Sequence, residues 1–260
     1  MTLIIGIKCS DGVIVGADGA ATLGSLDTRT AEQPTKKLYI HHNKIIIGVS
    51  GAVGLGQRLN AEIDRLYSGG GLANKEPDQA MTIMSTSLRE HILPELKVAA
   101  ETGKVVGNAA LNSAITASLI ALPIKHKPCL FQFDHQGSPE ESTEELPFAC
   151  VGSGQTIADP FLGFIRRVFW NNGCPNINQA IFATIWTLQH AISLNTGGVS
   201  EPIQIMGLIK PENGDWEAKE YSETELSEHK EAIIAVEGKL KEFKQEFHAS
   251  SEAEDIPTPQ

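Results

Sequence analysis

The segment that decides the fold is TLIIGIKCSDGVIVGAD, residues 2–18. Two apolar, β-branched runs, residues 3–7 and 13–15, flank the sequence Ser10-Asp11-Gly12. Asp-Gly between two apolar runs is a strong hairpin signal, because type I′ turns need positive φ at both central residues. The segment therefore predicts a two-stranded ribbon that returns the carboxylate of Asp18 to the neighbourhood of Thr2.

Thr2 is a candidate nucleophile. Removal of Met1 would leave this threonine with a free α-amine beside its own hydroxyl. An α-amine titrates near about pH 7.7–8.0, so a useful fraction is neutral at physiological pH and can accept the hydroxyl proton. Many proteins begin with Met-Thr, so the assignment of Thr2 as a nucleophile depends on the motifs that follow it.

That pattern is an ordered series of motifs along the chain. After residues 2–18 come Ala21-Thr22-Leu23-Gly24, Lys36-Lys37-Leu38-Tyr39, Gly48-Val49-Ser50-Gly51, Phe133-Asp134-His135-Gln136-Gly137-Ser138 and Val151-Gly152-Ser153-Gly154. The series resembles the proteasome β-type subunits, including the bacterial ATP-dependent heat-shock protease subunit, which are N-terminal-nucleophile hydrolases. The resemblance extends over roughly residues 2–210, and its nearest branch looks like the bacterial proteasome homologues.

The order of predicted elements agrees with that resemblance. Strands are expected at residues 2–9, 13–18, 38–40, 44–49, 115–122, 128–134 and 203–209, and helices at 53–67, 77–100, 155–170 and 177–194, with a polar loop at 138–147. Alternating groups of strands and helices favour an α+β fold with antiparallel sheets between helix layers. The resemblance implies an αββα sandwich of the N-terminal-nucleophile hydrolases over residues 2–220.

The C-terminal part matches nothing in that family pattern. Leu226, Ile233, Leu240 and Phe247 recur every seven residues, and Val236 and Phe243 take the complementary positions. Such a heptad stripe predicts an extra amphipathic helix over residues 221–249, docked on its own domain or paired with a neighbouring subunit. Residues 250–260 read as a disordered acidic tail.

The resemblance implies acyl transfer to threonine. The hydroxyl of Thr2 would attack a peptide carbonyl, and the α-amine, through a water, would move the proton. Lys37 would place a cation beside Thr2, Asp18 would orient that cation, and the backbone N–H of Gly51 would stabilise the oxyanion. Ser153 matches the family's supporting serine.

Two of these site assignments, the inward-pointing lysine and the oxyanion donor, have an alternative residue. Lys36 could point inward in place of Lys37, although the spacing from Lys37 to Gly51 is the one that matches the family. Gly48 is the second choice for the oxyanion donor. The glycines after residue 50 lack the Gly-Lys-Ser/Thr of a phosphate loop, and residues 152–154 lack the pattern of a nucleophile elbow.

The chain departs from the family near residue 193. Many proteasome β subunits carry Asp-x-x-Ser-Gly-Gly there, whereas this chain has Ser193 in place of the aspartate and Thr196 in place of the serine. Both remain candidate catalytic positions, but the negative charge is lost. The alignment also implies four substrate-binding residues, Ala21, Thr22, Val49 and Val53. Because their side chains are small or apolar, an uncharged substrate residue is expected before the scissile bond.

Composition argues against several classes of protein. The net charge is −11, and −9 of it lies from residue 211 onward, where 14 acidic side chains face 5 basic ones, so no basic face for nucleic acid is expected. The four cysteines are scattered, which indicates neither a zinc site nor a disulfide framework. No apolar run reaches the roughly 18 residues of a membrane span, and no signal peptide precedes Thr2. A cytoplasmic protein without cofactor or metal is expected.

Three functions follow from these observations. The first is a self-compartmentalising threonine endopeptidase, a homo-oligomeric double ring of six or seven subunits per ring that cleaves peptides or unfolded proteins. The second is an amidohydrolase of the same superfamily acting on a small amide. The third, kept open by Ser193, is a weak or silent ring subunit that acts as a scaffold. An ATPase unfoldase partner is conceivable, but no residue argues for one.

Overall fold

The computed structural model describes residues 2–25, 28–107, 109–112, 114–170, 173–194 and 198–251. Within these ranges the chain forms two compact units that divide between Tyr221 and Ser222. The first unit carries two five-stranded sheets and a two-stranded ribbon, and the second is a single helix.

The first sheet has the strand order β10-β1-β2-β11-β12. Its strands are β1 (Ile4–Cys9), β2 (Gly12–Ala17), β10 (Phe148–Val151), β11 (Gln204–Ile209) and β12 (Glu217–Glu220). All its pairings are antiparallel. The strands β1 and β2 form the predicted ribbon, and Ile4 lies opposite Ala17, so that Asp18 follows directly beside Leu3.

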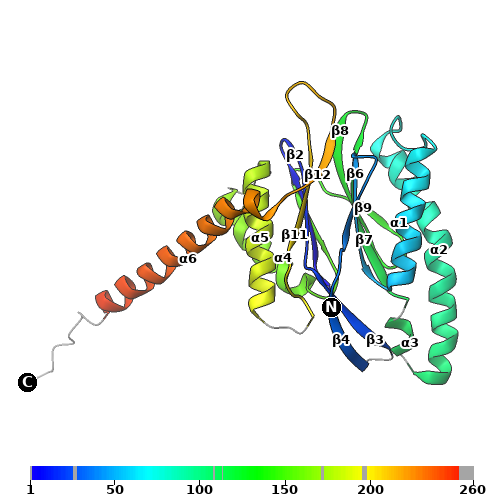
Figure 1. The fold of residues 1–260 in the computed structure, drawn as a ribbon, viewed down its shortest axis with the longest axis horizontal. Coiled ribbons are helices and arrows are strands. Elements are labelled where there is room, and N and C mark those ends of the chain that lie inside the picture. Colours follow the sequence, from blue (N-terminus) through cyan, green and yellow to red (C-terminus); the bar gives the residue numbers. More distant parts are fainter. Residues whose placement is uncertain are drawn as a thin grey trace, which may run out of the picture. The chain divides into compact units, whose positions relative to one another are not determined.

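The second sheet has the order β5-β6-β7-β8-β9, again with antiparallel pairings. It consists of β5 (Leu38–His41), β6 (Ile45–Gly51), β7 (Thr116–Ile124), β8 (Lys127–Phe133) and β9 (Pro139–Glu141). The ribbon of β3 (Ala20–Ser25) and β4 (Thr28–Pro34) stands apart from both sheets at the lower end of Figure 1.

Helices lie along the outer side of each sheet (Figure 1). The helices α1 (Val53–Ser68) and α2 (Pro77–Val106) pack on the second sheet through a fully apolar cluster, and the short α3 (Ala109–Asn112) follows them. The helices α4 (Gln155–Phe169) and α5 (Ile177–Ser193) contact the first sheet, α4 at β10 and α5 at β1 and β2. The expected α+β class, with antiparallel sheets and helices, is confirmed.

The two sheets share a second apolar core. Ile4, Val13 and Val15 of the first sheet pack with Leu38 and Ile46 of the second. These side chains are completely buried, and burial of each contributes roughly 1.5–3 kcal/mol before entropic costs. This core brings the beginning of β1 close to the beginning of β5, and that proximity creates the site described below.

The first turn differs from its prediction. The strands β1 and β2 are joined by Ser10 and Asp11, and neither Asp11 nor Gly12 has positive φ, so Asp-Gly is not the centre of a type I′ turn. Gly12 is instead the first residue of β2, and glycine is needed there because a Cβ would lie 2.4 Å from the carbonyl oxygen of Leu208. Positive φ pairs occur instead at 42–43 and 125–126, where β5 joins β6 and β7 joins β8.

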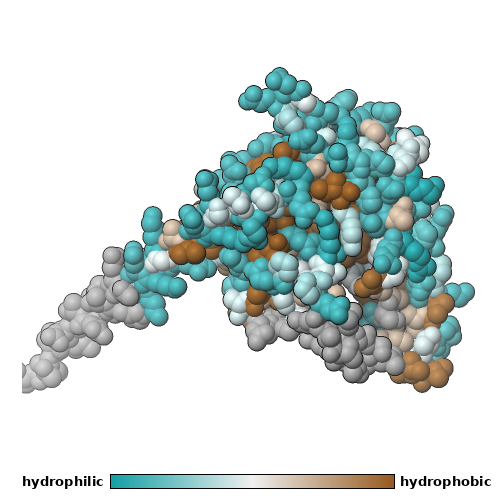
Figure 2. All heavy atoms as spheres, in the orientation of Figure 1, coloured by the Kyte–Doolittle hydropathy of each residue, from teal (hydrophilic) through white to brown (hydrophobic). Residues whose placement is uncertain are grey.

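Several elements have no counterpart in the sequence analysis. The strand β9 lies inside the segment that was expected to be a polar loop, and β3, β4, β10, β12 and α3 were not predicted. The helix α2 continues past the expected end to Val106. Val105 and Val106 at its end are exposed. Figure 2 shows hydrophobic side chains gathered at the lower right, the corner in which α2 ends in Figure 1.

The second unit is α6 (Glu223–Ser251), a helix over the region for which the heptad stripe predicts one. Two stripe residues, Leu240 and Phe243, are 54% and 64% exposed. The expected tail lies almost entirely outside the described residues, which end at residue 251. Among the described helices, none has the length and apolar character needed to span a membrane.

Candidate active site

Thr2, Lys37 and Asp18 form a connected cluster where the two sheets meet. The Nζ of Lys37 donates to both carboxylate oxygens of Asp18, at 2.7 and 2.8 Å, and lies 3.2 Å from the Oγ1 of Thr2. Asp18 is fully buried and Lys37 is 7% exposed, whereas Thr2 is partly open to solvent. The cluster therefore holds a desolvated ion pair against one accessible hydroxyl.

Backbone donors hold the Asp18 carboxylate from the other side. The N–H of Leu3 donates to Oδ1 at 2.9 Å, and the N–H groups of Ala20 and Ser200 donate to Oδ2 at 3.3 and 3.4 Å. Asp18 thus ties β1, β2 and the segment before β11 together. A buried charge of this kind is tolerated only because its partners compensate for the lost water.

The two adjacent lysines point to different partners. Lys36 makes an exposed ion pair with Glu220, at 2.8 Å, while Lys37 turns inward to Asp18. The alternative in which Lys36 points inward is therefore excluded by the geometry. Salt bridges exposed like that of Lys36 contribute little, typically below about 1 kcal/mol, so the inward pair is the consequential one.

Ser153 and Gly152 lie against the backbone of Thr2. The backbone N of Thr2 donates to the Oγ of Ser153 at 3.3 Å, and the N–H of Gly154 donates to the Thr2 carbonyl oxygen at 3.1 Å. Gly152 has a φ of 102°, and a Cβ at that position would lie 2.2 Å from the same carbonyl oxygen. Residues 152–154 therefore fix the position of Thr2 by close backbone approach.

Gly51 ends β6 at the same place. Its φ is 111°, and a Cβ would lie 2.0 Å from the carbonyl oxygen of Ile115, so only glycine fits. Gly48, the other candidate for the oxyanion donor, lies in the core between the sheets, where an added Cβ would be 2.8 Å from the Leu38 side chain and 3.0 Å from that of Ile4. Of these two glycines, Gly51 is the one that borders the open space in front of Thr2.

That space is a cavity of about 870 Å³. Its walls include Thr2, Lys37, Gly51 and Ser153, together with three of the predicted substrate-binding residues, Ala21, Val49 and Val53. The side chain of Thr22, the fourth, lies outside the described residues. The volume is in the range of ordinary ligand sites, which are about 300–1,000 Å³.

One face of α1 adds cavity residues that the sequence analysis missed. Gly56, Gln57 and Asn60 line the cavity with Val53. They follow Val53 by three, four and seven positions, and helical periodicity places those positions on one face. That spacing could have identified them. Asn112 and Ile115, which also line the cavity, carry no such signal.

Among the described residues, Ser193 is the predicted catalytic residue that lies neither in the cluster around Thr2 nor on the cavity wall. Its Oγ donates to the carbonyl oxygen of His190 at 2.8 Å, at the exposed C-terminal end of α5. Thr196 lies outside the described residues. The described cavity walls include two serines, Ser50 and Ser153, but not Ser193.

The cysteines do not provide a competing nucleophile within the described part of the chain. Burial raises the pKa of the Cys129 thiol to about 12, the pKa values of Cys9 and Cys150 well above their usual range, and the pKa of the half-buried Cys174 above its usual value. Thiols held in the protonated form are poor nucleophiles. The described residues also contain no group of three or more His, Cys, Asp or Glu side chains arranged to hold a metal ion.

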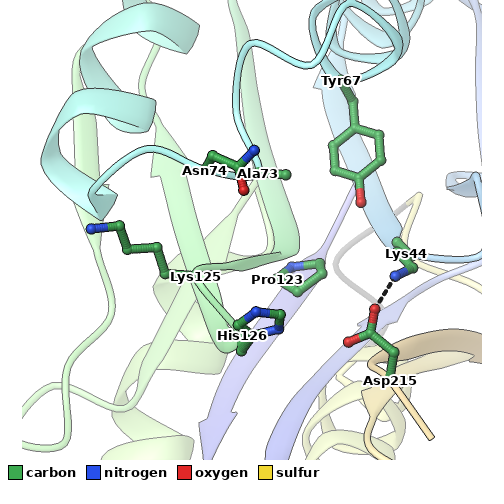
Figure 3. A pocket seen from close by; sticks show the side chains of 8 residues that line it. All are labelled: Lys44, Tyr67, Ala73, Asn74, Pro123, Lys125, His126 and Asp215. Atoms are coloured by element: carbon green, nitrogen blue, oxygen red, sulfur yellow. Dashed lines mark hydrogen bonds and ion pairs between the residues drawn. The ribbon is translucent and has the colours of Figure 1, made fainter.

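A second cavity, of about 420 Å³, lies between the turns that join β5 to β6 and β7 to β8 (Figure 3). Lys44 is ion-paired with Asp215 at one side of it, and Tyr67 points toward that pair (Figure 3). Lys125 on the opposite rim is ion-paired with Glu76. Because both lysines already have carboxylate partners, this cavity offers no concentrated charge to a ligand.

The sequence model of the family described as "Proteasome subunit" matches residues 2–163, which is more than half of the chain. A curated relative, the proteasome subunit beta of Methanocaldococcus vulcanius, is 29% identical over 161 residues. That match covers 60% of this chain and 61% of the relative, so the chain spans about three fifths of the relative's length.

Solved structures extend the likeness of fold to nearly the whole chain. The Anbu (ancestral beta-subunit) of Yersinia bercovieri is 15% identical, with a TM-score of 0.61 over 99% of both chains. An Anbu mutant from Hyphomicrobium sp. strain MC1 is 18% identical, with a TM-score of 0.65 over 99% of this chain and 100% of the other. The Anbu of Pseudomonas aeruginosa, solved as a helical assembly, is 14% identical, with a TM-score of 0.65 over 99% and 98%.

These three structures agree with the chain in fold, while the family match rests on the sequence of residues 2–163, which carries Thr2, Asp18, Lys37 and Ser153. The chain belongs to the proteasome subunit family.

Proposed function

We propose that this protein is a threonine-type endopeptidase that uses Thr2 as an N-terminal nucleophile after removal of Met1. One observation carries the proposal: the Oγ1 of Thr2 lies 3.2 Å from the Nζ of Lys37, which is ion-paired with buried Asp18, at the wall of an 870 Å³ cavity. The two facing sheets with helices outside them support the αββα sandwich of the N-terminal-nucleophile hydrolases as the fold.

The proposed reaction begins with attack of the Thr2 hydroxyl on a peptide carbonyl. The free α-amine takes the hydroxyl proton, directly or through a water, and returns it to the leaving amine. The Lys37 cation favours both the neutral amine and the developing alkoxide, because a positive charge within about 4–6 Å lowers their pKa values. Water then hydrolyses the acyl-enzyme by the same route in reverse.

The oxyanion of the tetrahedral intermediate would accept a hydrogen bond from the N–H of Gly51. The position of Gly51 on the cavity wall beside Thr2 supports this assignment. Ser153 would hold the α-amine, since its Oγ already accepts from the Thr2 nitrogen. Ser193 and Thr196 stay predictions, with no described contact that gives either a role.

We propose self-association as the second part of the function. A ring keeps folded proteins away from the nucleophile, and the Pseudomonas aeruginosa relative of the same fold forms a helical assembly. Pairing between copies would also cover exposed apolar side chains such as Leu240 and Phe243. Native mass spectrometry measures the number of subunits, and a monomer at micromolar concentration would contradict this part.

The substrate is proposed to be a peptide with an uncharged residue before the scissile bond. Ala21, Val49 and Val53 line the cavity and are small or apolar. A fluorogenic peptide series with Leu, Tyr, Arg or Asp at that position tests the preference. Fastest cleavage of the Arg or Asp peptide would overturn it.

A silent scaffold subunit is the alternative, because Ser193 replaces the family's aspartate and binds its own helix instead of the cavity residues. The decisive comparison is between wild type and Thr2→Ala at equal assembly state. Peptide hydrolysis by wild type that disappears in Thr2→Ala supports the peptidase. Equal, background-level hydrolysis by both proteins would favour the scaffold.

A further inference from the structure

We propose that Gln204 is a positioning residue that fixes Lys37 between Asp18 and Thr2. The inference rests on the proposed peptidase function. Gln204 is half-buried at the first position of β11 and is not one of the described residues that line the cavity. Its effect on the reaction therefore has to pass through another residue.

The segment that carries Lys37 has little regular support of its own. Residues 35–37 connect β4 to β5 and belong to neither strand. The ammonium group of Lys37 nevertheless makes three short contacts at once. Two are to the Asp18 carboxylate, at 2.7 and 2.8 Å, and one is to the Thr2 hydroxyl, at 3.2 Å. These distances leave little slack, because N–H···O bonds occupy a narrow range of about 2.7–3.2 Å.

The side-chain amide of Gln204 holds the backbone of this segment by three hydrogen bonds. Its Oε1 accepts from the N–H of Lys37 at 3.0 Å and from that of Leu38 at 3.3 Å, and its Nε2 donates to the carbonyl oxygen of Thr35 at 2.7 Å. Two backbone donors and one backbone acceptor determine the orientation of the amide without ambiguity. One side chain therefore holds the connecting segment at both ends.

The position of Gln204 in its sheet explains why this matters for the ion pair. Gln204 lies opposite Ala17 in the pairing of β11 with β2, one residue before Asp18. Lys37 precedes β5, which belongs to the other sheet. The amide consequently spans the two sheets and sets the distance between the strand that carries Asp18 and the segment that carries Lys37.

The test replaces Gln204 with methionine, which keeps the length of the side chain and removes all three hydrogen bonds. A misplacement of about 1 Å at a reacting centre costs up to about 100-fold, so kcat is expected to fall 10- to 100-fold, with KM unchanged within about twofold. The acidic limb of the kcat profile should move to higher pH, because a displaced Lys37 cation no longer favours the neutral amine of Thr2.

Two further variants separate positioning from general stability. Gln179→Met removes a side-chain hydrogen bond to Asn176 at the start of α5, and it should leave kcat and its pH profile unchanged. Gln204→Glu keeps an acceptor oxygen for the N–H groups of Lys37 and Leu38 but loses the donor to the Thr35 carbonyl, so kcat should recover only part of the way toward the wild-type value. If Gln204→Met does not fold, Gln204→Asn, which is one methylene too short, takes its place.

Crystal structures of wild type and the variant provide a readout that does not depend on hydrolysis. The inference predicts that the distance between the Lys37 Nζ and the Asp18 carboxylate lengthens in Gln204→Met. A folded variant with wild-type kcat, or one that loses kcat while this distance and the acidic limb stay unchanged, would overturn it. If wild type is inactive, the peptidase proposal fails, and the distance alone then decides the role of Gln204.

Discussion

The ammonium of Lys37 donates to both carboxylate oxygens of Asp18, and this pair joins the two sheets beside Thr2, which lies two residues before β1. Asp18 follows β2 in one sheet, and Lys37 precedes β5 in the other. The same buried pair therefore serves the packing of the sheets and the environment of the threonine hydroxyl.

Breaking the pair from one side should be costly. Lys37→Met leaves the buried Asp18 charge without its partner, and loss of one member of a buried pair costs about 3–5 kcal/mol. The double variant Asp18→Asn with Lys37→Met should be more stable than Lys37→Met alone, because no charge is left buried. Urea unfolding measures both values, and a single-variant loss below about 1 kcal/mol would be inconsistent with the account.

Gly152 should not tolerate a side chain. Gly152→Ala places a Cβ against the Thr2 carbonyl oxygen in a backbone conformation with a φ of 102°, so a loss of about 1–3 kcal/mol and a lower kcat are expected. Gly163→Ala is the matched control, since Gly163 lies inside α4 with nothing within 4 Å of the added Cβ. It should gain about 0.5–1 kcal/mol. Thermal unfolding of both variants gives the comparison.

Ser153→Ala should lower kcat by about tenfold with little change in KM. The Ser153 hydroxyl accepts from the Thr2 nitrogen at 3.3 Å, and one such hydrogen bond contributes about 1–1.5 kcal/mol. Ser227→Ala, which removes an exposed hydroxyl bonded to its own helix, is the control. Equal kcat in the two variants would remove Ser153 from the proposed mechanism.

The free energy of unfolding should depend on pH through Glu62, which connects α1 to α2. The Arg65 guanidinium, which donates to the two carboxylate oxygens at 2.5 and 2.8 Å, and the Ser87 hydroxyl lower the pKa of Glu62 from 4.5 to about 2. Because the folded pKa is the lower one, the stabilisation is fully present above about pH 4.5 and is lost as the pH falls toward 2. The expected loss is about 1–3 kcal/mol, reduced by the exposure of Arg65.

Unfolding by urea between pH 6 and the acid limit of stability measures that dependence. Glu62→Gln is the appropriate control, since its side chain keeps its volume but cannot titrate. The variant should show a shallower acid destabilisation than wild type. Parallel curves for the two proteins would show that Glu62 is not the titrating group.

Much of the fold and the cluster around Thr2 could be predicted from local sequence. The hairpin of residues 2–18 needs only two apolar runs and a turn between them, and its register then fixes Asp18 beside Leu3. The strands β9 and β12 could not be predicted in this way, because the sequences PEE and EAKE are charged and gain strand structure only by pairing at sheet edges.

Gln204 shows the corresponding limit for the site. It is 167 residues from Lys37 along the chain, and a single glutamine at the start of an apolar strand has no local signature. Only the three-dimensional pairing of β11 with β2 places its amide beside residues 35–38. The choice between Lys36 and Lys37 likewise required the positions of Glu220 and Asp18.

The most direct test is the intact mass of the purified protein before and after incubation with a peptide epoxyketone. That reagent forms its adduct only with a residue that carries both a hydroxyl and a free amine. We predict loss of the Met1 mass, followed by one adduct per chain in wild type and none in Thr2→Ala. A protein that retains Met1 and takes up no epoxyketone would contradict the proposal that Thr2 is an activated nucleophile.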